Sequence, residues 1–226
     1  AEIGAAAPRA VGVWLAADPA EPLHVQSDPR LGSVAAVAVA TEGRTVVAPC
    51  SPAHLEHLQG WLGELPDTYV VFHGAQDALL RLAAATHTDH AARHTRIGCT
   101  QTAALLLAEG TRRGRDLPSL TECTEKLLGA PWQQPERLTG DLLPASAAGA
   151  EALVPMMKAL TPLLRKRELT RVFALECDVL PAVVEMERAG LAVDAAAFER
   201  IAAQWHAERQ ETDDPERIAR LDKLIS

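Results

Sequence analysis

Apolar residues follow two different spacings along this chain, which predict strands in the first third and helices afterwards. Short apolar runs at Val11–Leu15, Val34–Ala40, Thr45–Ala48 and Tyr69–Phe72 are typical of strands. The turn sequence 41–44, which contains a glycine, predicts that the second and third runs form an antiparallel hairpin.

Helical spacing begins with Ser51-Pro52, an N-cap followed by proline, and continues to Leu65. A further helix directly follows the strand that ends at Phe72. From Thr100 onward the pattern is helical throughout, and the predicted helices are 103–108, 117–128, 145–164, 169–189, 194–209 and one beginning near 212. In the helix at 169–189, an apolar stripe is formed by Leu175, Val179, Val183 and Met186.

The order strand, hairpin, helix, strand, helix predicts an α/β fold, in which helices flank a mixed sheet. The helices that follow predict a C-terminal helical extension. We expect the boundary near residue 165, which gives a sheet domain at 1–165 and an extension at 166–226. The first residue is alanine rather than methionine, so we expect the chain to be a piece of a longer protein.

Composition narrows the classes of function. Hydrophobic residues make up 48% of the chain and charged residues 23%, which is typical of a globular protein. No apolar run approaches the roughly 20 residues that cross a bilayer, and no secretory leader opens the chain, so we expect no membrane partner and a cytoplasmic location. The net charge of −8 disfavours nucleic acid in bulk, and any contact with it must use local basic patches.

Two basic groups are candidates for DNA contact. One consists of Arg112, Arg113 and Arg115, and the other of Arg165, Lys166 and Arg167. The alternative for both is an ordinary solvated face or a helix C-terminus that favours cations.

The sequence predicts no metal site. The four cysteines are far apart and form no C-x-x-C pair. Histidines at 87, 90 and 94, and the pair His54 and His57, lack the three or four preorganised ligands that zinc needs. We therefore interpret them as solvated side chains.

The stretch from Phe173 to Asp194 carries a distinctive pattern, in which Met186-Glu187 is followed by Gly190 and then Asp194. It resembles the segment E-x-P-L-x-x-V-L-x-x-M-E-x-x-G-[IV]-x-[IVL]-D of family A DNA polymerases, the DNA polymerase I type. In that family this segment joins a proofreading domain to the polymerase domain. The resemblance implies a parent protein that is a DNA-directed nucleotidyltransferase using Mg²⁺.

The upstream part resembles the ribonuclease H-like 3′–5′ exonuclease domain of the same family. Residues 28–49 are similar to its hairpin. Residues 72–80 resemble its second motif, H-N-x-K-x-D-x-x-x-L, with Asp77 as the aspartate, and 117–129 resembles a later L-x-x-L-x-x-x-x-L-G stretch. The resemblance covers residues 11 to about 210.

The carboxylates that such an exonuclease needs are largely missing. Enzymes of this class use two metal ions about 4 Å apart, held by carboxylates from three motifs. The first motif, Asp-x-Glu, corresponds to Val13–Ala17, which has no acid, and the third, Tyr-x-x-x-Asp, corresponds to Ala145–Gly149. Gln101 stands where an Asp-Thr pair is usual. Asp77 remains, and it is better explained as a first-turn acid interacting with its helix dipole.

The sequence therefore predicts a vestigial proofreading domain, which serves as a scaffold and DNA-contacting module for DNA synthesis by the parent. It would bind no cofactor itself, and its partners would be the polymerase domain and the primer-template in the nucleoid. One alternative is an active exonuclease with a rearranged metal site at Asp18, Asp77, Asp141 and Glu151. Another is a free-standing protein-interaction module.

Overall fold

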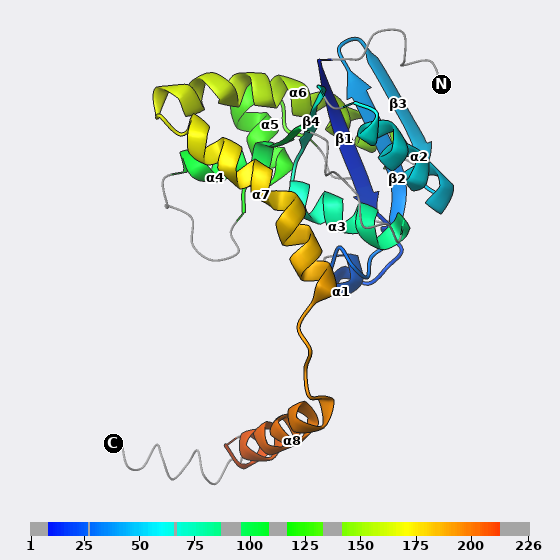
Figure 1. Ribbon diagram of the computed structural model, residues 1–226, viewed down its shortest axis with the longest axis vertical. Coiled ribbons are helices and arrows are strands. Elements are labelled where there is room, and N and C mark those ends of the chain that lie inside the picture. Colours follow the sequence, from blue (N-terminus) through cyan, green and yellow to red (C-terminus); the bar gives the residue numbers. More distant parts are fainter. Residues whose placement is uncertain are drawn as a thin grey trace. The chain divides into compact units, whose positions relative to one another are not determined.

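The computed structural model describes residues 9–26, 28–65, 67–86, 96–108, 117–132 and 142–212. Contacts between residues divide the chain into two compact units, 1–188 and 189–226. The first unit contains a five-stranded sheet with helices around it (Figure 1). The second contains one described helix.

The sheet is mixed, as the sequence predicts. Its strands are β1 (Ala10–Ala17), β2 (Val34–Thr41), β3 (Arg44–Pro49), β4 (Tyr69–Phe72) and β5 (Arg96–Cys99). Their order in space is β3-β2-β1-β4-β5. The first three strands pair antiparallel, while β4 is parallel to β1 and β5 is parallel to β4. The hairpin is confirmed, and the four-residue β5 is an addition that the apolar pattern did not predict.

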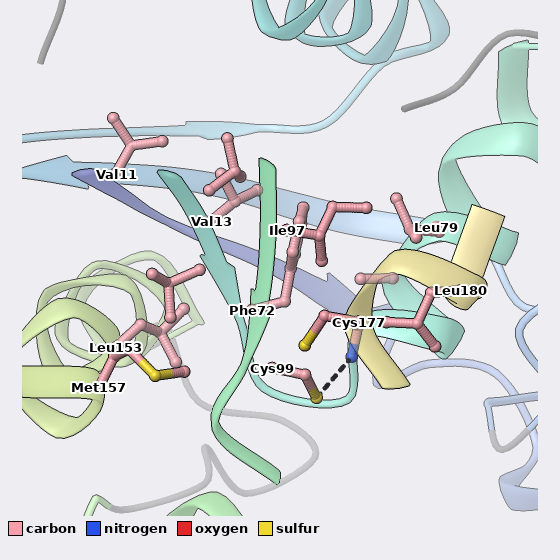
Figure 2. Close-up of a cluster of buried hydrophobic side chains, with 14 of the residues drawn as sticks. Val11, Val13, Phe72, Leu79, Ile97, Cys99, Leu153, Met157, Cys177 and Leu180 are labelled. Atoms are coloured by element: carbon pink, nitrogen blue, oxygen red, sulfur yellow. Dashed lines mark hydrogen bonds between the residues drawn. The ribbon is translucent and has the colours of Figure 1, made fainter. Parts of the chain in front are cut away.

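Helices surround this sheet, and apart from the short α1, which the sequence did not predict, they begin and end near their predicted positions. They are α1 (Leu23–Gln26), α2 (Pro52–Gly63), α3 (Ala75–Thr86), α4 (Thr100–Leu107), α5 (Leu120–Leu128), α6 (Leu142–Lys166) and α7 (Thr170–Ala189). Ser51 caps α2 as expected, because its side chain accepts a hydrogen bond from the backbone N–H of His54. One sulfur atom links the starts of α3 and α4. Cys99 Sγ accepts from the N–H groups of Ala75 and Thr102, each at 3.4 Å. Figure 2 shows one hydrogen bond at this sulfur as a dashed line.

The two faces of the sheet bury different helices. Leu153 and Met157 of α6 lie on one side, whereas Val11 and Val13 of β1 project to the other (Figure 2). The second face packs on α2 and α3, whose core residues include Leu55, Leu58, Leu62, Leu79 and Leu82. This two-sided burial explains why β1 reads as a continuous apolar run rather than an alternating one.

Helix α6 approaches β1 so closely that only glycine fits between them. A Cβ atom at Gly12 would clash with the backbone carbonyl oxygen of Ala150 and lie 3.1 Å from Leu153 Cβ. Small residues also line the neighbouring contact, where Ala38 and Ala40 of β2 pack with Ala150. Because these residues are so small, the long helix α6 can pack closely against the centre of the sheet.

Helix α7 has two apolar faces. The face that packs on the sheet unit consists of Phe173, Cys177, Leu180 and Val184, all buried. The stripe seen in the sequence lies largely on the outside: 66% of Leu175, 42% of Val179 and 72% of Met186 remain exposed. Both faces have helical spacing, and the sequence pattern alone singled out the outer one.

Because of this packing, α7 belongs to the compact unit that ends at Arg188. The expected boundary near residue 165 falls one helix earlier, close to the end of α6 at Lys166. Whether residue 165 also divides an exonuclease-like domain from a thumb-like extension stays a prediction.

The second unit contains α8 (Ala195–Thr212). Asp194 caps it as predicted, since its Oδ1 accepts from the backbone N–H of Ala197 at 3.0 Å. The helix predicted beyond residue 212 lies outside the described residues. Among the helices that are described, none combines the length and apolar character needed to cross a membrane.

The close approach at Gly12 can be tested by substitution. We expect Gly12→Ala to lower the free energy of unfolding by roughly 3 kcal/mol, because a backbone carbonyl must move to admit the methyl group. Gly60→Ala is the matched control. It lies inside α2 with open space around it, so the same change should stabilise by about 0.5–1 kcal/mol. Urea denaturation measures both, and equal effects would contradict the packing argument.

Candidate functional site

The carboxyl end of β1 is where the resemblance places the first exonuclease motif. Side chains alternate along a strand, so Gly12, Trp14 and Ala16 share the face that packs on α6. A pair of carboxylates two residues apart would have to occupy that face to meet acids on α6. The positions in register are therefore those of Trp14 and Ala16, and neither carries a charge.

The third motif corresponds to the start of α6, directly opposite Trp14. A Cβ atom at Gly149 would lie 3.2 Å from Cδ2 of Trp14 and 3.3 Å from Nε1 of Trp132. The position that holds the motif's aspartate is thus crowded by two indole rings. Ala145, in the place of the motif's tyrosine, lies one turn earlier on the same helix.

The two tryptophans form a tilted aromatic pair. Their ring centroids are 5.0 Å apart with an interplanar angle of 59°, which is a favourable arrangement for aromatic rings. Trp132 is held on two sides: its indole N–H donates to the carbonyl oxygen of Ala145 at 2.9 Å, and its backbone N–H donates to Thr124 Oγ1 at 2.7 Å. These contacts fix the two indole rings between β1 and α6, and the pair of Trp14 and Trp132 is called the plug below.

The second motif begins at His73, directly after β4. His73 Nε2 donates to the carbonyl oxygen of Pro118 at 2.9 Å, so Nδ1 of the neutral ring accepts from the Thr100 hydroxyl, also at 2.9 Å. The Thr100 hydroxyl also lies 3.2 Å from the carbonyl oxygen of Phe72. Burial lowers the pKa of His73 to about 4, and its hydrogen bond to Pro118 opposes that shift. His73 therefore ties β4 to α4 and to the start of α5 as a neutral group.

Counted from His73, the aspartate of the H-N-x-K-x-D pattern falls on Ala78, one residue after Asp77. Ala78 is buried, whereas Asp77 is at the surface in the first turn of α3. Neighbouring residues of a helix project about 100° apart, so Asp77 cannot take over the direction of its neighbour. The assignment of Asp77 as a motif remnant stays a prediction, and the residue in register is an alanine.

Asp77 instead belongs to a charged cluster beside the loop that follows β1. Desolvation raises its pKa, Arg81 opposes this effect, and Glu187 and Asp28 reinforce it. Arg81 is only 9% exposed and donates to the carbonyl oxygens of Gly32 and Gln26. The cluster therefore fastens the loop to α3, which is a structural role.

The other acids of the rearranged-site alternative are engaged elsewhere. Asp18 Oδ1 accepts from the N–H of Ala20, forming a turn, and Glu151 accepts from the Thr45 hydroxyl at 2.6 Å. Asp141 lies outside the described residues. In the part of the chain that the structure describes, no group of three or more His, Cys, Asp or Glu side chains could hold a metal ion.

Of the remaining candidate residues, Arg165 and Lys166 form the last turn of α6 and Arg167 follows them, all exposed. Gln101 donates to the carbonyl oxygen of Pro118 at 3.2 Å. The arginines at 112, 113 and 115 and the histidines at 87, 90 and 94 lie outside the described residues. His54 Nδ1 lies 3.1 Å from Ser51 Oγ at the start of α2, where it belongs to the helix cap.

No protein-family model matches the chain, and no curated protein sequence matches it. Solved structures do. NrnC of Brucella melitensis, with bound Mg²⁺, superimposes with a TM-score of 0.65 at 18% identity, covering 85% of this chain and 93% of that one. Escherichia coli RNase D, an exoribonuclease involved in structured RNA processing, gives a TM-score of 0.58 at 12% identity over 88% and 50%.

The POL domain of Pol1 from M. smegmatis, in complex with DNA primer-template and dNTP, gives a TM-score of 0.68 at 19% identity. It covers 91% of this chain but only 33% of that larger chain. Identities this low establish the fold alone. The fold is that of the ribonuclease H-like 3′–5′ exonucleases.

The sequence shows that the expected carboxylates are absent, but it does not predict the contact between Trp14 and Trp132 at these positions. Trp14 and Trp132 are 118 residues apart, and no local spacing connects them. The available signal was the set of small residues, Ala145 and Gly149, that face a tryptophan in a strand.

The state of His73 makes stability depend on pH. Between about pH 6.5 and pH 4 the unfolded chain binds a proton at this residue and the folded chain does not, so stability is lost as the pH falls through this window. The loss should reach about 3 kcal/mol, from about 1.4 kcal/mol for each pH unit.

The free energy of unfolding is measured by urea denaturation at pH 7, 6, 5 and 4 for the wild type and for His73→Gln. Asp77 and other titrating groups contribute equally to both proteins, so the difference between them reports on His73. The imidazole of the wild type is followed in parallel by NMR. An imidazole that titrates near pH 6.5 would contradict the buried, neutral assignment.

Proposed function

We propose that the chain is a catalytically inactive 3′–5′ exonuclease-like domain, which serves as a scaffold in a family A DNA polymerase. The observation that carries this proposal is the replacement of the expected metal ligands. Trp14, Ala16, Ala78 and Gly149 occupy the four positions in register with the carboxylates of the three motifs, and Trp14 packs on Trp132 there.

The chemistry explains why these replacements abolish hydrolysis. Two divalent ions stabilise the attacking and the leaving oxygen atoms in this class of reaction. Mg²⁺ is a hard ion that keeps its water unless oxygen ligands replace it. Alanine, glycine and tryptophan side chains provide no such oxygen, so charge stabilisation of many kcal/mol is lost.

The scaffold role rests on the outer face of α7. Leu175, Val179 and Met186 are exposed at one stripe of a helix whose other face is already buried. Such a stripe is typical of a surface that packs on another domain. We assign it to contact with the polymerase domain, which would supply the Mg²⁺ and the catalytic carboxylates from outside this chain.

Contact with the primer-template would be a minor part of this role. Arg165, Lys166 and Arg167 provide a compact cationic group at the end of α6, and Arg112, Arg113 and Arg115 are the second candidate group. Roles in replication and repair, and a location at the nucleoid, follow from the same proposal.

The first test asks whether the chain degrades nucleic acid. We expect no shortening of a 5′-labelled single-stranded DNA or RNA in Mg²⁺ or Mn²⁺, because no cluster of ligands is available in the described part of the chain. Shortening that Asp77→Ala abolishes would overturn the proposal in favour of an active, rearranged site. Asp67→Ala, an exposed acid outside the cluster, is the matched control.

The second test restores the ligands. The variant W14D/A16E/A78D/A145Y/G149D removes the plug and places acids at the positions in register. We expect it to bind Mn²⁺ by calorimetry where the wild type binds none, provided that circular dichroism shows it folded. A folded variant that binds no Mn²⁺ would contradict the assignment of these positions.

A further inference from the structure

We propose that a cavity at the amino ends of β4 and β5 binds a free nucleobase or nucleoside. The cavity has a volume of about 550 Å³ and lies among β4, β5, the end of α6 and the start of α7. Neither Trp14 nor His73 lines it: Trp14 lies in the middle of β1, and His73 follows the carboxyl end of β4. The inference therefore does not depend on the function proposed above.

The lining of the cavity is mainly apolar. Ile97, Leu164 and Phe173 contribute to it and are 6%, 2% and 7% exposed. Ligand sites are typically cavities of 300–1,000 Å³ with apolar walls and a few polar groups that set orientation. This cavity has the size and the walls for a flat heterocycle with an attached sugar.

Tyr69 provides a fixed polar group. Its ring lies over Gly98 of β5, where a Cβ atom would be 2.5 Å from both Cζ and the hydroxyl oxygen. The absence of a side chain at Gly98 is thus what seats the ring. Burial raises the pKa of Tyr69 well above its usual range, so the phenol is neutral and can both donate and accept. Within the described residues its hydroxyl has no hydrogen-bond partner.

Arg96 and Asp178 bring opposite charges to the same cavity. Both act electrostatically on the Tyr69 hydroxyl, and they have opposite effects on its pKa. The described part of the chain contains no ion pair between them within 4 Å. The rim therefore offers a strong donor and a strong acceptor, both free to bind a ligand.

A donor and an acceptor at the rim favour a ligand that has a hydrogen-bond acceptor and a donor side by side on one edge of its ring. A ring carbonyl accepts from a guanidinium, and the adjacent ring N–H donates to a carboxylate, as the two groups stand in hypoxanthine or guanine. A simple carboxylate ligand would pair with Arg96 but be repelled by Asp178, and a hydrocarbon would use neither the donor nor the acceptor at the rim. Burial also raises the pKa of the Cys177 thiol to about 12, so the thiol stays protonated and binding is non-covalent.

The experiment is calorimetric titration of the full 226-residue chain with inosine, a soluble nucleoside that carries this edge. Purine riboside is the matched ligand, because it keeps the rings and sugar but lacks the carbonyl and the ring N–H. We expect inosine to bind at least tenfold more tightly. No binding of inosine up to 10 mM, or equal affinity for the two ligands, would overturn the proposal.

Variants locate the site. Ala174 is an exposed residue of the lining, so Ala174→Trp should fill the cavity and abolish binding without unfolding the chain. Tyr69→Phe should weaken inosine binding roughly three- to tenfold through one lost hydrogen bond. Arg171→Gln, on the same helix but outside the lining, should leave the affinity unchanged. Undiminished binding by a folded A174W variant would place the nucleoside elsewhere and refute the assignment.

Discussion

The contact of α6 with β1 is the constraint on which the rest of this structure depends. It exists because Gly12 has no side chain, so the carbonyl oxygen of Ala150 can approach the strand. The same approach brings Gly149 against Trp14 two residues further along β1. In a nuclease of this fold, that proximity would bring acids of the strand and of the helix to shared metal ions. Here the same backbone geometry brings an indole to a glycine.

An indole in the place of metal-binding acids changes how the region between β1 and α6 is stabilised. Carboxylates gathered in a cleft repel one another unless cations are bound, and they tend to destabilise the fold around them. The pair of Trp14 and Trp132 packs without any cation, and the carbonyl oxygen of Ala145 accepts the hydrogen bond of the half-buried indole N–H of Trp132. Under the function proposed above, aromatic packing would stand where an exonuclease of this fold has metal ligands. The proposal then predicts a domain whose shape is held by packing alone.

How far the sequence predicts the structure depends on the range of each interaction. Strands such as β1 and the hairpin of β2 and β3 were predicted, because apolar runs and a glycine turn are local signals. The short β5 was not, since four residues carry little pattern. The outer stripe of α7 stood out in the sequence because all its members are plainly apolar, whereas the inner face includes Cys177 among Phe173, Leu180 and Val184. The assignment of Asp77 to the motif stays a prediction, and counting from His73 places the motif's aspartate at buried Ala78. The Trp14–Trp132 contact could not be foreseen from residues 118 positions apart.

The two faces of α7 connect these conclusions. Its inner face, at Phe173 and Cys177, closes the sheet unit and forms one wall of the cavity beside Tyr69. Its outer face, at Leu175 and Met186, remains exposed. One helix thus contributes to both surfaces, so any displacement of α7 would change the cavity and the stripe together. A domain packed on the outer stripe would therefore press on the same helix that lines the cavity. Occupancy of the cavity and docking on the stripe would then be linked through the position of a single helix.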